Sequence, residues 1–497
     1  MKQYDDLIIG SGISGMTLSL LLARCGRKVL LLEKSRVIGG SMQRFIRNGI
    51  PFDTGFHFTT ELKGCMSDMT RMLGFGDELK TDPITANFYI ADSGKFYRLP
   101  HGRDQICEAL CKYFPDDKSK ILDYFRLEKE IFNSTPVFHL EKSAFEETSF
   151  RPEDEITLKE YLDSMKITGD LRSLLACFVT CHGTPCREIS LANHCRVSYG
   201  LLDDLVRVRG SGGTFIEAFR KQSEKLGIEI RTGCTIAECL ELERARCRKT
   251  HLTDGTEVGF EDCIMTIHPH AIIPLLPEQY RKGIFMDRLR EFEEGCGFFT
   301  VFAVLEKECP SFRQELSSYF TTSNIDDIMT PEHPEATATG IMLSDEPGPE
   351  GKIFHTVTAF ENVFQEETRR WEGTQTGKRG PEYQEYKKRK CKAIEKKIYE
   401  IYPEFQGSLK ILDSASMLTY RDYLSPYGSA YGIRQKTGQM NLFGKLPIRN
   451  FYAAGQNALL PGAMGAMLSA FIIWRKVVGE EIYMTKLAEV RKGVGNE

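Results

Sequence analysis

The chain of 497 residues lacks several features that would tie it to a membrane or a nucleic acid. It has no uninterrupted apolar run of about eighteen residues, so we expect no membrane-spanning helix. Its first apolar strand follows Met1 closely, without a basic and then apolar leader, so we expect no signal peptide. Lysine plus arginine (65) nearly balances aspartate plus glutamate (69), and the net charge of −4 does not indicate nucleic-acid binding. We therefore expect a cytoplasmic protein that at most associates with a membrane surface.

Two further kinds of pattern are missing. The fifteen cysteines are scattered and contain no C-x-x-C pair, which favours reduced thiols in a cytoplasmic or anaerobic setting. Cys181, His182 and Cys186 lie close in sequence but lack the second ligand pair of a tetrahedral zinc site, so we predict no metal site. No Ser-His-Asp or Cys-His nucleophile set is evident either. Any chemistry is therefore expected to come from a cofactor.

The N-terminal part of the chain contains a glycine-rich turn in a specific context. A short apolar run precedes this turn, and an apolar, helix-permissive stretch and a second apolar strand follow it. These four segments are residues 6–9, 10–15, 16–24 and 28–33. Strand, G-x-G-x-x-G turn, helix and strand in this order are typical of a dinucleotide-binding unit. The sequence therefore predicts an α/β protein that begins with a Rossmann-like fold.

Each residue type of the turn has a physical role in such a unit. Gly10 permits the tight turn, Gly12 lets the backbone approach a pyrophosphate, and Gly15 lets the helix pack closely on the strand. Ile13 and Ser14 open the helix, where free N–H groups and the positive end of the helix dipole face the phosphates. We expect all five residues to contact the cofactor.

An acidic residue and a second glycine turn narrow the choice of nucleotide. Glu33 ends the second strand, where a carboxylate can accept hydrogen bonds from an adenosine ribose. Lys34 follows it, and Gly40, Ser41 and Met42 lie a few positions further on. This pattern resembles FAD-dependent oxidoreductases more than NAD dehydrogenases. We therefore expect these five residues to contact FAD held without a covalent bond.

Residues 52–58 carry the first specific family resemblance. Their sequence, Phe-Asp-Thr-Gly-Phe-His-Phe, resembles the segment that brings backbone to the flavin edge in the phytoene desaturase superfamily. A histidine two places after Asp-Thr-Gly is most similar to the carotenoid isomerase and retinol saturase branch. The resemblance implies that His57 lies near the flavin, where histidine is a suitable proton donor. A histidine buried only for packing or hydrogen bonding is the alternative.

The C-terminal part of the chain resembles the same superfamily. Residues 416–432 are similar to its Thr-x-x-Tyr and Gly-x-x-Tyr-Gly stretch near the reacting face of the flavin, which implies a site role for Tyr431. An apolar strand then ends at Gly455, which in the family passes close to the ribityl phosphate, beside Gln456. The remaining cofactor contacts implied by the resemblance are Ile236 at the adenine and Met464, Gly465 and Ala466 at the pyrimidine end.

Two departures from the family pattern stand out. The family often has an acidic residue where this chain has the neutral Gln456. The family also has a small-residue turn where this chain has Ile267-His268-Pro269-His270.

The resemblance implies a Rossmann-like FAD-binding domain, of the glutathione-reductase and amine-oxidase type, with a mixed α+β substrate domain inserted in two segments. The FAD domain is expected to comprise residues 1–85, 190–270 and 415–497. The substrate domain, with a helical cap, is expected to comprise residues 86–189 and 271–414.

Local patterns predict several elements of the substrate domain. Helices are expected over 104–113, 121–132, 171–179 and 382–402, strands over 298–305 and 352–360, and a mobile surface loop over 366–381. Thr157 and Glu160 form a capping-box pattern. The basic run 387–390 is expected to be a solvated helix face or a contact for anionic lipid.

The implied function is that of an FAD-dependent oxidoreductase acting on carbon–carbon double bonds of a long apolar isoprenoid or polyene, as a saturase or a desaturase. The alternatives are a redox-neutral carotenoid isomerase, a flavin amine oxidase, and a non-catalytic flavin-binding or lipid-carrier protein. No second dinucleotide fingerprint is present, so NAD(P) would bind only transiently, as an electron donor or acceptor. Peripheral membrane contact fits an apolar substrate, no nucleic-acid partner is expected, and the oligomeric state stays open.

Overall fold

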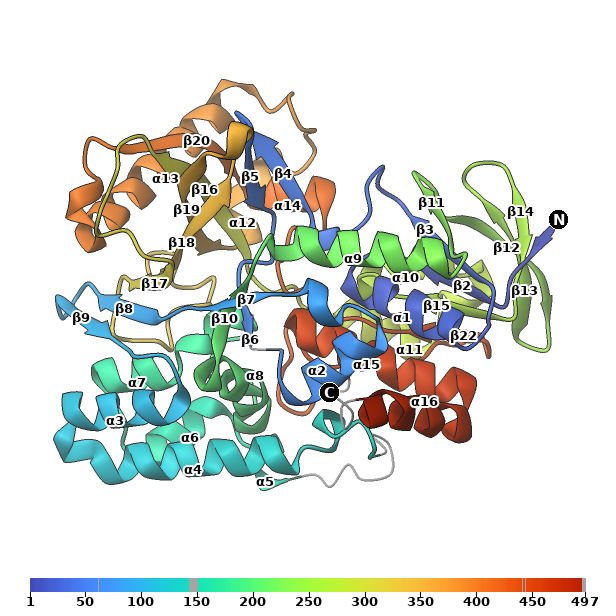
Figure 1. The fold of residues 1–497 in the computed structure, drawn as a ribbon, viewed down its shortest axis with the longest axis horizontal. Coiled ribbons are helices and arrows are strands. Elements are labelled where there is room, and N and C mark those ends of the chain that lie inside the picture. The colour runs from blue at the N-terminus through green and yellow to red at the C-terminus, as the bar shows by residue number, and fades with distance from the viewer. Residues whose placement is uncertain (61, 143–150, 440, 443, 494–497) are drawn as a thin grey trace.

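The computed structural model describes residues 1–60, 62–142, 151–439, 441–442 and 444–493. Two large sheets dominate it: one lies among helices α1, α9 and α15, and the other lies between helix α13 and a group of shorter helices (Figure 1). Within the described residues, no helix combines the length and the apolar character needed to span a membrane.

The first large sheet contains the glycine-turn unit predicted from the sequence. Five of its strands run parallel, and a short sixth strand pairs antiparallel at one edge. In spatial order they are β11 (Glu229–Thr232), β3 (Val29–Glu33), β2 (Asp6–Ile9), β15 (Asp262–Met265), β22 (Phe451–Ala453) and β21 (Gly444–Lys445). The sheet therefore combines segments that are more than 400 positions apart in the sequence.

Alternating side chains of this sheet pack into two different layers. Ile8, Leu31 and Ile264 face helices α1 (Ile13–Arg24), α9 (Ser211–Lys225) and α15 (Gly462–Val478). The side chains that point the other way pack on a second, four-stranded sheet. Its strands are β1 (Lys2–Gln3), β14 (Glu257–Gly259), β13 (Arg246–Leu252) and β12 (Ile236–Glu243). These helix, parallel-sheet and antiparallel-sheet layers confirm the predicted Rossmann-like fold class.

The second large sheet has seven strands and is mainly antiparallel, with one parallel pair between β17 and β8. In order they are β20 (Leu409–Ala415), β16 (Gly297–Leu305), β19 (Ile353–Val363), β18 (Ala338–Pro347), β17 (Glu315–Phe320), β8 (Ala86–Ile90) and β9 (Lys95–Arg98). Strands from residues 86–98 and 297–415 thus share one sheet. The exact domain boundaries given above stay a prediction.

A group of helices packs under the β17, β8 and β9 end of this sheet (Figure 1). It contains α3 (Arg103–Tyr113), α4 (Lys118–Ser134), α6 (Leu158–Ser164), α7 (Gly169–Leu175) and α8 (Leu191–Asp203). The helix predictions over 104–113 and 121–132 are confirmed, as is the Thr157–Glu160 capping box. The helix predicted over 171–179 is too long. It ends at Leu175 and a 3-10 turn, η5 (Cys177–Cys181), follows; both pieces are buried, so hydrophobicity alone does not mark the break.

Helix α13 (Gly380–Ile401) confirms the helix predicted over 382–402, and it covers the opposite face of the sheet. The expected loop before it is partly helical, with α12 (Gln365–Thr368) and η9 (Arg369–Trp371). The prediction was wrong there because Trp371 is buried, with its ring 5.3 Å from that of Tyr383. The residues around Trp371 are mostly polar, so their composition did not indicate that this one side chain anchors the segment in the core.

The basic run on α13 is only partly a solvated face, which corrects the first interpretation. Lys387 donates a hydrogen bond to the carbonyl of Ser414. Lys390 lies 2.7 Å from Glu361, a buried carboxylate on β19. Burial alone would raise the pKa of Glu361, but Lys397 and Lys390 lower it to about 2. Half of the run therefore stabilises the seven-stranded sheet and is not available to lipid.

Candidate functional site

The turn between β2 and α1 has the geometry that a dinucleotide requires. Gly10 adopts a φ of +99°, which side-chain-bearing residues rarely adopt. A Cβ on Gly15 would lie 1.9 Å from the carbonyl oxygen of Gly10, so only glycine allows this contact between helix and strand. A Cβ on Gly12 would meet no atom within 4 Å. The open side of the turn at Gly12 therefore forms a cradle that fits a diphosphate.

Glu33 lies beside this turn at the end of β3. One of its carboxylate oxygens accepts hydrogen bonds from the backbone N–H of Ser11, at 2.9 Å, and from the Ser11 hydroxyl. The other accepts from the backbone N–H of Ser35 at 2.8 Å. The carboxylate is thus fixed at the carboxyl end of the parallel sheet, where α/β proteins bind nucleotides. Lys34, the next residue, is exposed.

The second glycine turn faces the first. A Cβ on Gly40 would lie 3.2 Å from the Cα of Gly12. Gly40 and Met42 are the ends of the 3-10 turn η1, and Ser41 between them is exposed. Met42 is buried under α9, where a Cβ on Gly212 would lie 2.1 Å from the Met42 carbonyl oxygen. The sequence therefore predicted correctly that the two glycine turns lie side by side.

The start of α15 meets the start of α1 at the same sheet edge. The hydroxyl of Ser14 donates a 2.9 Å hydrogen bond to the carbonyl of Ala466. Gly455 has a φ of +119°, and its N–H donates to the hydroxyl of Ser469 at 2.7 Å. A Cβ on Gly465 would lie 2.1 Å from the Leu460 carbonyl oxygen. Two helix N-termini therefore converge where a cofactor would carry negative charge, which suits FAD.

The remaining predicted cofactor residues are distributed around this edge. Met464 lies in the first turn of α15. The amide of Gln456 donates to the carbonyl of Ala430 at 3.4 Å, which joins the sheet edge to the loop that carries Tyr431. Ile236 begins β12 and is buried in the layer below the parallel sheet. Contact of any of these residues with FAD stays a prediction.

Both predicted catalytic residues belong to one array of aromatic rings. The His57 imidazole stacks on Phe360, with ring centroids 4.8 Å apart and planes 6° apart. Phe360 meets Phe298 edge to face at 5.6 Å, and Phe298 meets Tyr431 in the same way at 6.1 Å. Strands β19 and β16 supply the two phenylalanines that connect His57 with Tyr431. The sequence predicted the strands over 298–305 and 352–360 correctly, but it did not single out either ring.

Side chains from distant segments fix the backbone around His57. The Arg207 guanidinium donates to the carbonyl of His57 at 2.7 Å. The Ser211 hydroxyl donates to the carbonyl of Phe56 at 2.6 Å. The Tyr420 hydroxyl donates to the carbonyl of Thr54 at 3.1 Å. The sequence did not indicate Arg207 as a site residue, because the short strand that contains it, β10 (Leu205–Val208), matches no recognisable motif.

Arg207 also belongs to a buried group of four charges, which we call the charge tetrad: Arg44, Asp53, Arg207 and Glu346. Asp53 lies 2.7 Å from Arg44 and 2.8 Å from Arg207. Glu346 on β18 lies 2.7 Å from Arg44 and also contacts Arg207. Burial alone would raise the pKa of Asp53, but Arg207, His57 and Arg44 together outweigh this effect and hold the pKa well below its usual value. The tetrad therefore joins the segment before His57 to the seven-stranded sheet.

Tyr431 lies at the other end of the ring array. Burial raises the pKa of its phenol well above the usual value, so the hydroxyl stays protonated. A Cβ on Gly183 would lie 3.1 Å from the Tyr431 ring, so the loop containing Cys181, His182 and Cys186 packs beside it. His182 contacts His194, with ring nitrogens 3.1 Å apart, rather than the two thiols. The loop that contains this trio therefore packs against Tyr431.

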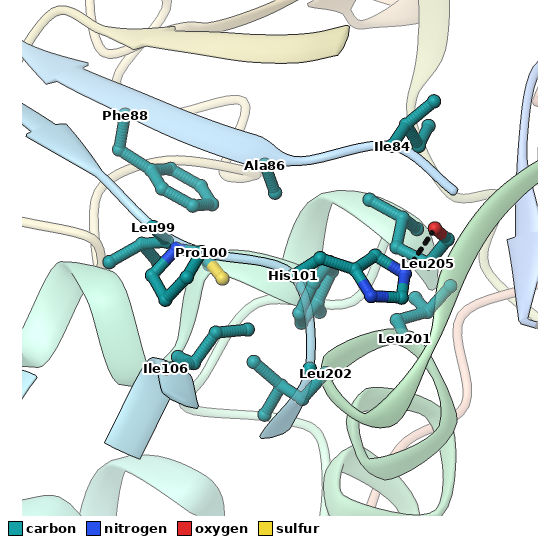
Figure 2. A pocket seen from close by; sticks show the side chains of 13 residues that line it. Ile84, Ala86, Phe88, Leu99, Pro100, His101, Ile106, Leu201, Leu202 and Leu205 are labelled. Carbon is teal, nitrogen blue, oxygen red and sulfur yellow. Dashed lines mark hydrogen bonds between the residues drawn. The ribbon is translucent and has the colours of Figure 1, made fainter. Parts of the chain in front are cut away.

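Two hollows lie near these elements. Figure 2 shows the first, an apolar cavity of about 10 Å³ between β8 and helices α3 and α8, with His101 bonded to the Leu205 carbonyl at its edge. Its walls belong to the same hydrophobic cluster that Phe360 joins. The second is a cleft of about 570 Å³ lined by Met464, Phe132 and Tyr199, among others. The larger volume is within the usual range for small-molecule sites.

Comparisons with known proteins agree with this geometry. A family model described as flavin containing amine oxidoreductase matches residues 13–293. An all-trans-retinol 13,14-reductase from Danio rerio is 23% identical over 537 residues, covering 97% of this chain and 87% of that protein. A chloroplastic prolycopene isomerase from an Oncidium hybrid cultivar is 34% identical over 175 residues, covering 32% of this chain and 29% of that protein.

A solved structure shares the fold at low sequence identity. Putrescine oxidase bound to putrescine superposes with a TM-score of 0.64 at 15% identity, covering 96% of this chain and 98% of that chain. The match therefore extends over both large sheets of the molecule.

Proposed function

The chain belongs to the family of flavin containing amine oxidoreductases, and from this premise we propose that it reduces a carbon–carbon double bond of a long apolar polyene. It is an FAD-dependent oxidoreductase, and the proposal concerns its substrate and direction. The observation that carries the proposal is the ring array from His57 through Phe360 and Phe298 to Tyr431. Such a row of aromatic rings contacts an extended apolar substrate by dispersion.

FAD, when bound, supplies the hydride chemistry. We propose that the backbone at Gly12 holds its diphosphate and that Glu33 holds its ribose. The first turn of α15, with Met464 to Ala466, would stabilise the negative charge that two-electron reduction adds to the ring system. The protein contributes binding, orientation and this fixed electrostatic field.

His57 is proposed to deliver the proton that accompanies each hydride. Its Nδ1 lies 3.8 Å from an Asp53 oxygen, too far for a direct hydrogen bond, and it has no aligned hydrogen-bond partner among the described residues. Phe360 fixes the plane of the ring by stacking, and Arg207 fixes its backbone. A histidine so oriented, with a free ring nitrogen, can hold and release a proton.

Similarity to the retinol reductase over nearly the whole chain favours saturation over desaturation. The shorter match to a prolycopene isomerase supports redox-neutral isomerisation as the second candidate. Amine oxidation is the third, because a putrescine oxidase shares the fold. A free NAD(P) molecule is proposed to serve only as a transient electron donor.

We propose that the substrate is drawn from a membrane surface by the helical cap. Tyr113 on α3 and Leu122 on α4 are 44% and 48% exposed, and such side chains can insert among lipid headgroups. Co-sedimentation with liposomes tests this contact. Binding that Tyr113→Ser and Leu122→Ser together abolish supports the cap, and binding unchanged by this pair excludes it.

Product analysis tests the proposed reaction. The flavin-loaded protein, reduced without oxygen, is mixed with all-trans-retinol, with prolycopene, or with putrescine, and the oxidised protein is mixed with the same panel. We expect a product heavier than the polyene by two hydrogens from the reduced protein only. A product of unchanged mass indicates isomerisation. Flavin reduction by putrescine indicates an amine oxidase, and either result contradicts saturation.

A further inference from the structure

Three side chains with metal-binding atoms meet where the sequence departs from the family's small-residue turn. His268 and His270 follow β15, and Glu294 approaches them from the segment before β16. Their ligand atoms all lie within 4.8 Å of one another. His268 Nε2 is 3.2 Å from one oxygen of Glu294, and His270 Nδ1 is 3.0 Å from the other. The proposed redox reaction uses none of these groups.

These short contacts are not aligned hydrogen bonds. His268 Nε2, His270 Nδ1 and Glu294 Oε1 are buried and have no aligned hydrogen-bond partner among the described residues. His268 as a whole is only 8% exposed. Unpaired buried polar atoms are costly, so a group of three in one place requires an explanation. A cation between them would satisfy all three at once.

The outer contacts of His270 and Glu294 fit a metal site. His270 Nε2 donates to the Leu289 carbonyl at 2.7 Å, and because a carbonyl only accepts, the proton of a neutral ring must be on Nε2. Nδ1 then directs its lone pair toward the carboxylate, and two lone pairs 3.0 Å apart repel each other. Ser429 donates to Glu294 Oε2 at 2.6 Å and orients the carboxylate. Such second contacts fix ligands in known metal sites.

His268 can also serve as a ligand, with one rearrangement. Its Nδ1 accepts a long, 3.3 Å hydrogen bond from the N–H of His270. A metal ion on Nε2 would shift the ring proton to Nδ1 and break this contact. The released N–H belongs to the first turn of a short helix, α10 (Pro269–Ile272), where N–H groups commonly lack an intrahelical partner.

We propose that His268 Nε2, His270 Nδ1 and the Glu294 carboxylate bind a divalent transition metal ion such as Zn²⁺. Two imidazoles and one carboxylate are a common zinc set that leaves a position open. Ligands at about 2.0–2.1 Å around a tetrahedral ion lie roughly 3.3 Å apart, close to the two histidine–carboxylate separations of 3.2 and 3.0 Å. The ion would connect the loop after β15, Glu294 and the Ser429 segment that leads to Tyr431.

Zinc binding to the full-length, flavin-loaded protein tests the site without any turnover measurement. The protein is stripped with a chelator and titrated with Zn²⁺, and bound zinc is measured per flavin. We expect one tightly bound zinc ion, and we expect His268→Gln and Glu294→Gln each to weaken it by about 100-fold or more. The control is His333→Gln, which removes a surface histidine that also lies near two carboxylates, Asp327 and Glu335. It should leave the tight site intact.

Two results of the zinc titration would overturn the proposed site. If no tight zinc ion binds, or if the two variants bind it as the natural chain does, the cluster is an ion pair between protonated His270 and Glu294. Should the variants lose flavin, Co²⁺ bound to the natural chain is the second measurement. Ligand-field absorption at wavelengths longer than the flavin bands supports the site, and its absence overturns it. These measurements can therefore disprove the zinc site without disproving the proposed polyene reaction, and product analysis can disprove the reaction without disproving the site.

Discussion

Arg207 donates a guanidinium N–H to the backbone carbonyl of His57 at 2.7 Å, while its other terminal nitrogen contacts Asp53. One buried arginine thus connects the predicted proton donor to the charge tetrad. The same tetrad includes Glu346 on the seven-stranded sheet. The position of His57 relative to the sheet therefore depends on charges far apart in sequence.

Removing Arg207 should destabilise the protein strongly. Arg207→Met leaves Asp53 and Glu346 buried with Arg44 as their remaining partner in the tetrad, and unpaired buried charge costs about 3–5 kcal/mol. Urea denaturation of the flavin-loaded protein measures the change. The matched control is Arg209→Met, which breaks an ion pair of a 64% exposed side chain with Asp82 and should change the unfolding free energy far less, because exposed ion pairs contribute little. Equal effects of the two variants would contradict the role of the tetrad.

His57→Gln should slow proton delivery while leaving the cofactor in place. Glutamine keeps some hydrogen bonding but cannot donate a titrating proton, so oxidation of the reduced flavin by substrate should slow by about 10²-fold. Stopped-flow absorbance measures this rate. His355→Gln changes a partly exposed histidine on the same strand as Phe360 and should have no effect. Reoxidation at the natural rate in His57→Gln, with flavin bound, would limit His57 to packing.

Glu33→Ala should weaken FAD binding. Losing a carboxylate that accepts charge-assisted hydrogen bonds costs about 1–3 kcal/mol, or roughly 5- to 150-fold in affinity. Titration of the flavin-free protein with FAD, followed by fluorescence, measures this change. Glu224→Ala removes an exposed acid at the far end of α9 and is the control. Equal affinities would remove Glu33 from the ribose site.

Glu128 in the helical cap should make stability depend on pH. Burial raises its pKa from 4.5 to about 7 despite hydrogen bonds from Ser198 and the nearby Arg103. A carboxyl whose pKa is raised by folding stabilises the fold below pH 4.5 and loses this contribution as the pH rises through about 7. Glu128→Gln cannot ionise, so its unfolding free energy should fall less between pH 5 and 8, by roughly 1–3 kcal/mol. Parallel stability curves for the two proteins would disprove the raised pKa.

The features that the sequence predicted correctly are local. The two glycine turns, the strand ending at Glu33 and the helix starting at Ile13 follow from short-range sterics, so a few adjacent residues suffice to recognise them. The apolar strands of the parallel sheet are equally clear because both of their faces are buried. The Rossmann-like fold class therefore followed from about forty residues at the N-terminus.

The features that it missed depend on contacts between distant segments. The tetrad joins Arg44 to Glu346, and neither residue lies in a recognisable motif. Phe298 and Phe360 belong to strands whose hydrophobicity also suits a plain core, so composition cannot mark them as a substrate surface. The departure at His268 and His270 was visible in the sequence, but its third member, Glu294, became evident only from the fold.

Single-turnover oxidation of the reduced flavin by a polyene tests the central claim most directly. The flavin-loaded protein is reduced in the absence of oxygen and mixed with one equivalent of all-trans-retinol, and flavin absorbance and product are followed together. We expect one flavin to be reoxidised for each polyene molecule that loses one double bond. Flavin that stays reduced while the polyene is unchanged or only isomerised would contradict this expectation.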